Sequence, residues 1–79
     1  MRLNVLLFAS YADAFGTPSV GVTLPDGASV EELLTEVRRM SHAPGLPPAA
    51  VAVNQEYVER SHRLAAGDEV AIIPPVAGG

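Results

Sequence analysis

The stretch SVEELLTEVRRM, residues 29–40, is the only long helical pattern in the sequence, and it decides the fold class. It opens with a capping-box pattern: the Ser29 hydroxyl can accept a hydrogen bond from the Glu32 amide, and the Glu32 carboxylate can reach back to the Ser29 amide. Apolar residues then recur at helical spacing and predict one buried stripe, made of Val30, Leu33, Leu34, Val37 and Met40. Pro44-Gly45 cannot continue a helix, so we expect it to end at residues 41–42.

Short segments with the alternating pattern of strands flank this helix on both sides. Because the first two are joined by only a short helical turn over 10–15 that ends at Gly16, we expect them to pair antiparallel. Leu64 stands alone as a core anchor before a turn at 66–68. The expected strands are residues 2–9, 19–24, 50–54, a brief pair at 57–58, and 69–73, with a turn at Gln55-Glu56.

One amphipathic helix requires one sheet face against which to bury its apolar stripe. The sequence therefore predicts an α+β fold, a mixed sheet of four to five strands with one main helix on one face. This order of elements resembles that of the ubiquitin-like β-grasp, in which the first and last strands are neighbours at the centre of the sheet. We expect a single domain over 1–79, with residues 75–79 as a flexible C-terminal tail.

Composition excludes several classes of function. The chain has 79 residues, no cysteine and a net charge of −4, so it offers no thiolate site and no basic surface for nucleic acid. No apolar run is long enough to span a membrane, and no signal peptide is recognisable, which favours the cytoplasm. His42 and His62 lie far apart without ligand-like spacing, so we expect no bound metal or cofactor. All five cations are arginine, so the chain has no lysine that could accept an isopeptide bond.

The most informative segment for function is the end of the chain, where Pro74-Pro75-Val76-Ala77 precedes Gly78-Gly79. Glycines without a Cβ leave the last carboxylate accessible on a slim tip. From Pro75 to Gly79 an extended tail reaches about 17 Å at roughly 3.4 Å per residue, while Pro74-Pro75 stiffens its base. The sequence indicates that the reactive group is the carboxyl of Gly79, which another enzyme must activate because a bare carboxylate is not electrophilic.

Taken together, Val53-Asn54-Gln55 and the run Leu64-Ala65-Ala66-Gly67-Asp68-Glu69-Val70-Ala71-Ile72-Ile73-Pro74-Pro75-Val76-Ala77-Gly78-Gly79 resemble the small subunit of molybdopterin synthase, a β-grasp sulfur carrier. The opening Val5-Leu6-Leu7-Phe8-Ala9 also fits, so the resemblance spans essentially the whole chain. It implies a chain that is not catalytic alone but donates sulfur within a sulfurtransferase complex.

The resemblance also implies a cycle. An E1-like enzyme uses ATP and magnesium to adenylate Gly79, a sulfur-donating enzyme supplies sulfur to form a thiocarboxylate, and the tail enters a large subunit. There the sulfur is transferred to a pyranopterin precursor, within an expected heterotetramer.

A partner surface is predicted on the sheet face opposite the helix. Phe8 and Ile73 alternate away from their buried neighbours, and Tyr57 is expected nearby. Small proteins rarely expose such a patch without a use. With the tail residues Pro74, Pro75, Val76 and Ala77, these side chains form the expected partner-binding set.

Three other functions stay open on the sequence. Sulfur carriers for thiamine or for tRNA thiolation share the fold and the Gly-Gly tail, although thiamine carriers usually lack Pro-Pro-Val before it. A ubiquitin-like protein modifier would use the same activation. A pure binding module with an inert tail would use none of it.

Overall fold

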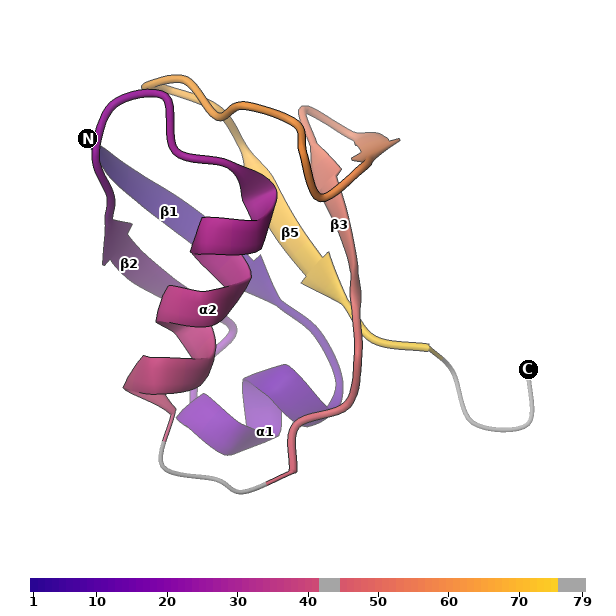
Figure 1. Cartoon of the computed structure of the whole chain (residues 1–79). Coiled ribbons are helices and arrows are strands. Elements are labelled where there is room, and N and C mark those ends of the chain that lie inside the picture. Colours follow the sequence, from indigo (N-terminus) through magenta and orange to yellow (C-terminus); the bar gives the residue numbers. More distant parts are fainter. Residues whose placement is uncertain (42–44, 76–79) are drawn as a thin grey trace.

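The computed structural model describes residues 1–41 and 45–75 and shows a mixed five-stranded sheet with a helix across one face (Figure 1). The order of strands across the sheet is β2-β1-β5-β3-β4. The elements along the chain are β1 (Arg2–Leu7), α1 (Ser10–Phe15), β2 (Ser19–Thr23), α2 (Val30–Met40), β3 (Ala50–Val53), β4 (Glu56–Val58) and β5 (Val70–Ile73). This is the predicted α+β fold with one main helix.

The centre of the sheet is the parallel pair of β1 and β5. Leu6 lies opposite Ala71, and Leu7 lies opposite Ile72. β2 pairs antiparallel with the outer side of β1, as expected from the short connection, and β3 pairs antiparallel with β5. The last strand is therefore held on both sides, so the chain leaves the sheet from an interior strand.

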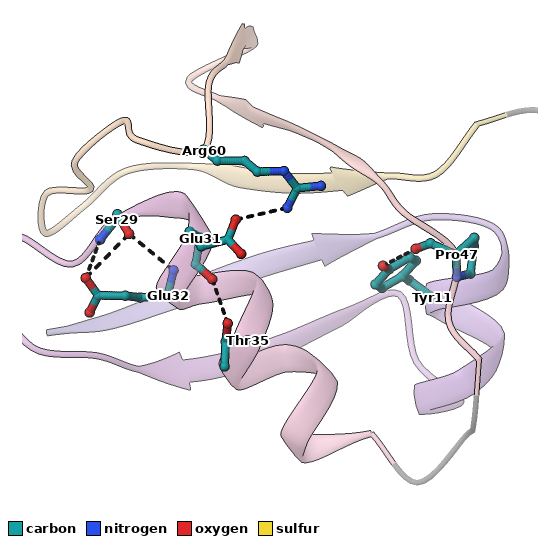
Figure 2. Close-up of polar contacts among 7 residues, drawn as sticks. All are labelled: Tyr11, Ser29, Glu31, Glu32, Thr35, Pro47 and Arg60. Carbon is teal, nitrogen blue, oxygen red and sulfur yellow. Dashed lines mark hydrogen bonds and ion pairs between the residues drawn. The ribbon is translucent and has the colours of Figure 1, made fainter.

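Helix α2 begins with the predicted capping box and is also tied to the segment that precedes Leu64. Both hydrogen bonds between Ser29 and Glu32 form (Figure 2). The backbone amides of Val30 and Glu31 donate to the carbonyls of His62 and Arg60 at 2.9 and 3.0 Å. The amides of the first turn, which lack partners within the helix, thus find carbonyls elsewhere in the fold.

The core lies between α2 and the sheet. It holds the predicted stripe of Val30, Leu33, Leu34 and Val37, while Met40 packs only at its margin. Leu64 is buried as expected. Tyr11, which the sequence pattern did not single out, is fully buried, and its hydroxyl donates to the Pro47 carbonyl at 2.5 Å (Figure 2). That bond joins α1 to the segment leading into β3.

The other predicted strand bounds differ from the structure by one residue each, and two predictions are wrong for clear backbone reasons. β1 ends at Leu7 instead of Ala9, because Ala9 has φ 50° and ψ −124° and turns the chain into α1. The turn after β3 falls on Asn54-Gln55, not on Gln55-Glu56, and both residues have positive φ, as a tight hairpin turn requires. Within the part of the chain that is described, no helix has the length and apolar character needed to cross a membrane.

Candidate functional site

The face of the sheet opposite α2, here called the open face, carries a row of apolar side chains. Strand alternation buries Val5 and Ile72 beneath α2, so Leu6 and Ala71 point the other way. The strand register continues this row across the sheet, through Leu6, Ala71, Ala52 and Tyr57. The row thus combines residues from four strands.

Phe8 and Ile73 extend this row toward the end of β5. The apolar patch is the set Leu6, Phe8, Ala52, Tyr57, Ala71 and Ile73, and its residues line one shallow hollow together with Gln55 and Glu69. Phe8 is 48% exposed and Tyr57 is 71% exposed, large fractions for aromatic side chains. The structure therefore brings the three predicted residues Phe8, Tyr57 and Ile73 together on one surface.

The backbone around Ala9 holds Phe8 at the rim of the patch. Ala9 has a positive φ of 50°, which residues with a Cβ rarely adopt. The Phe8 carbonyl accepts from the Tyr11 amide at 3.1 Å, and the Ala9 carbonyl accepts from the Asp13 amide at 3.0 Å. These bonds fix the corner at which Phe8 leaves the sheet and α1 begins.

A second hollow adjoins the patch at the base of the tail. Its lining is apolar and consists of Pro48, Ala49, Ala50, Tyr57, Ile73, Pro74 and Pro75. Pro74 is buried, whereas Pro75 is exposed, so Pro75 is the first residue after β5 that stands clear of the domain. Tyr57 and Ile73 border both hollows, which makes the two surfaces continuous. The other predicted tail residues, Val76, Ala77, Gly78 and Gly79, lie outside the described residues.

At the opposite end of the patch, Asn54 and Asp68 form a clasp between the β3–β4 turn and the loop before β5. Asn54 Nδ2 donates to Asp68 Oδ1 at 3.0 Å, and the Ala65 amide donates to Asp68 Oδ2 at 2.8 Å. The bond from Ala65 and then that from Asn54 hold the pKa of the Asp68 carboxyl below its usual value. The clasp physically links the β3–β4 turn to the loop before β5, two segments that are far apart in the sequence but that the family resemblance grouped together.

Sequence reasoning named fewer patch residues than the structure shows. Alternation alone places Leu6 and Ala71 on the open face, so a stricter use of that pattern would have added both. Ala52 needed the strand order, because its place beside Ala71 and Tyr57 depends on which strands pair. Among residues 1–41 and 45–75, no group of three or more potential metal ligands gathers.

Comparison with known sequences gives a consistent result along the whole chain. The sequence model of the ThiS family matches residues 5–79. A molybdopterin synthase sulfur carrier subunit from Chlamydomonas reinhardtii is 39% identical and is aligned over 100% of both chains. The protein of the same name from Escherichia coli is 37% identical, over 98% of this chain and 99% of its own length.

Solved structures give the same fold. The small archaeal modifier protein 1 from Haloferax volcanii superposes with a TM-score of 0.76 at 28% identity, over 95% of this chain and 98% of that one. A chain from the complex of subunits 1 and 2 of the Helicobacter pylori molybdopterin-converting factor has a TM-score of 0.61 at 22% identity, covering 100% of each chain. The second likeness concerns the fold alone.

Proposed function

The chain belongs to the ThiS family, and from this premise we propose that it is the sulfur carrier subunit of a molybdopterin synthase. The observation that carries the proposal is the alignment over essentially the full chain with relatives of that name, at 39% identity to the Chlamydomonas reinhardtii protein and 37% to the Escherichia coli protein. We propose that it acts in the cytoplasm, where its substrates and partners would be available.

In this proposal the reacting atom is the carboxyl carbon of Gly79. The carboxylate attacks the α-phosphate of magnesium-bound ATP in an E1-like enzyme, which forms an acyl adenylate and releases pyrophosphate. Sulfide-level sulfur from a sulfur-donating enzyme then attacks the acyl carbon, AMP departs with the electrons of the broken bond, and loss of a proton leaves a C-terminal thiocarboxylate. Adjacent Gly78 has no Cβ, so it lets the tip pass through a narrow channel.

The fold supports delivery of that tip into a partner. β5 lies between β1 and β3, so the base of the tail is held by a strand that is paired on both sides (Figure 1). Burial of Pro74 extends this rigid anchor by one residue, and Pro75 is exposed directly beyond it. A rigid base lowers the ordering cost when Val76 to Gly79 enter a pocket. The proposed partner is the large subunit, in a heterotetramer, where the sulfur passes to a pyranopterin precursor.

The apolar patch is the proposed binding surface for the activating enzyme and for the large subunit. It adjoins the tail base through Tyr57 and Ile73, so a protein that binds the patch is positioned to receive the tail. Aromatic side chains in apolar surroundings are common energetic anchors of interfaces. Phe8 and Tyr57 are the two most exposed large hydrophobic residues of the described chain, and they fit that role.

The test is chemical conversion followed by transfer. After incubation with the E1-like enzyme, ATP, magnesium and a sulfur source, the intact mass should rise by about 16 Da, because sulfur replaces one oxygen. The product, mixed with the large subunit and the pterin precursor, should yield the dithiolene. An unchanged mass would support a binding module with an inert tail, and a thiocarboxylate that yields no dithiolene would overturn the molybdopterin assignment.

A protein-modifier role is the second candidate, favoured by the likeness to the small archaeal modifier protein of Haloferax volcanii. The chain has no lysine, so it cannot form lysine-linked chains with itself, although it could still modify other proteins. Mass spectrometry of cell lysates for remnants of this tail on lysines would detect that role. Carriers for thiamine or tRNA thiolation remain alternatives within the carrier class, and the transfer assay with the pterin precursor separates them.

A further inference from the structure

Glu69 places a carboxylate at the edge of the apolar patch farthest from the tail. It directly precedes β5 and shares its alternation with Ala71 and Ile73, which puts its side chain on the open face. Glu69 lines the same hollow as the patch residues and is exposed. No ion pair involving Glu69 occurs in the described parts of the chain.

The backbone of Glu69 is held in place by the clasp. Its amide donates to Asn54 Oδ1 at 3.0 Å, and its carbonyl accepts from the Asn54 amide at 2.8 Å. The neighbouring Asp68 carboxylate is bonded to Asn54 and Ala65. Four hydrogen bonds thus fix the point from which the Glu69 side chain projects, and a fixed group loses less conformational freedom on binding.

Charge is sparse on the rest of the open face. Within the described strands, the other charged residue on this face is Arg2, and it lies on the far side of β1, over β2. Its guanidinium covers Gly21, where an added Cβ would meet Arg2 Nη2 at 2.7 Å. Among the described residues, Glu69 is therefore the one carboxylate that borders the hollow lined by the patch.

We infer that Glu69 binds an arginine or lysine of the large subunit when that protein docks on the apolar patch, and so sets the orientation of docking. The inference rests on the proposed carrier function, which supplies a protein partner for this face. A partner that contacted the patch through apolar side chains alone could slide or rotate on it, because hydrophobic contact is not directional. A cation paired with Glu69 removes that freedom, since charge complementarity fixes register and suppresses wrong partners.

The length of β5 sets the expected distance between the partner's cation and the base of the tail. From Glu69 to Ile73 is four residues of extended chain, or about 13 Å at roughly 3.3 Å per residue. The partner should therefore carry a basic side chain about 13 Å from the entrance of the pocket that takes the tail, measured back along β5. Apolar contact with Leu6, Ala71 and Tyr57 fills the space between.

The probe is the large subunit of molybdopterin synthase from the same organism, with association and dissociation rates measured by surface plasmon resonance. The variants are Glu69→Gln and Glu69→Arg, and the matched control is Glu59→Gln. Glu59 is also exposed, but it borders a different hollow, beside α2. The bonds that hold Glu69 use its main-chain atoms, so both variants should fold, which thermal melts check.

We expect Glu69→Gln to lower affinity about fivefold at about 0.05 M salt, mainly through slower association, and Glu69→Arg to lower it further. The difference from wild type should vanish at about 0.5 M salt, because the interaction is screened there. Loss of packing alone would not depend on salt in this way. A basic residue of the partner changed to Glu should restore binding of Glu69→Arg.

Each outcome either supports or overturns the inference about Glu69. Equal affinities of wild type and Glu69→Arg at low salt would overturn the inference while leaving the carrier function standing, and so would an equal effect of the Glu59 control. Absence of binding by the wild-type chain would overturn the proposed function and this inference with it. Salt-dependent loss confined to the Glu69 variants supports both.

Discussion

Replacing Tyr11 with Phe should destabilise the protein by about 1.5 kcal/mol, through the loss of one hydrogen bond. Tyr11 is completely buried, and its hydroxyl donates to the carbonyl of Pro47, 36 residues away in sequence, at 2.5 Å. Phe fills the same space, so no cavity forms. The variant loses a net bond worth about 1 kcal/mol and leaves the Pro47 carbonyl partly unsatisfied. That carbonyl lies at a half-buried residue, so water replaces some of the lost interaction.

The expected change in melting temperature follows from the size of the chain. At about 2.1 cal/mol/K per residue, 79 residues give an unfolding entropy of roughly 0.17 kcal/mol/K, so 1.5 kcal/mol corresponds to about 9 °C. The assay is thermal and urea unfolding followed by circular dichroism. Tyr57→Phe is the matched control, because the same atom is removed from a residue that is 71% exposed, and stability should change by less than about 0.5 kcal/mol. Equal stabilities of the Tyr11 and Tyr57 variants would refute the assignment of this bond as a tertiary anchor.

Three further substitutions test other parts of the structure. Ala9→Gly should stabilise the protein by about 1 kcal/mol in urea unfolding, because relief of the strain at φ 50° outweighs the extra chain entropy of glycine; a loss of stability would contradict that backbone geometry. Asp68→Asn should cost about 1 kcal/mol at pH 7 by weakening the bonds to Ala65 and Asn54. Because the folded state lowers the pKa of Asp68, the ionised carboxylate contributes stability above its unfolded pKa of about 3.9, and this contribution is lost as the pH falls through the folded pKa. The unfolding curves of wild type and Asp68→Asn should therefore converge in acid. A difference in stability that widens there would be evidence against the clasp. Leu33→Ala should cost about 3 kcal/mol in the same assay, since Leu33 is fully buried on the face of α2 that packs against the sheet, and a loss below about 1 kcal/mol would show that the core can collapse around it.

Features set by local interactions were predictable from the sequence. The start of α2 depends on Ser29 and Glu32, which are three residues apart, so the capping box could be read directly and is confirmed. The buried stripe of α2 and the alternating faces of β1 and β5 follow from the periods of helix and strand, and they too are confirmed. The Gly-Gly ending was equally visible, and its proposed chemistry needs no tertiary contact.

Only the tertiary structure decided what those local elements bring together. Leu6 lies beside Ala71, 65 residues further along the chain, because β1 and β5 pair in parallel, and no local pattern specifies that register. The same holds for the bond from Tyr11 to Pro47 and for the clasp of Asn54 with Asp68. The physical reason is that hydrogen-bonded turns and side-chain periodicity act within a few residues, whereas strand order is chosen by burial of the whole core at once.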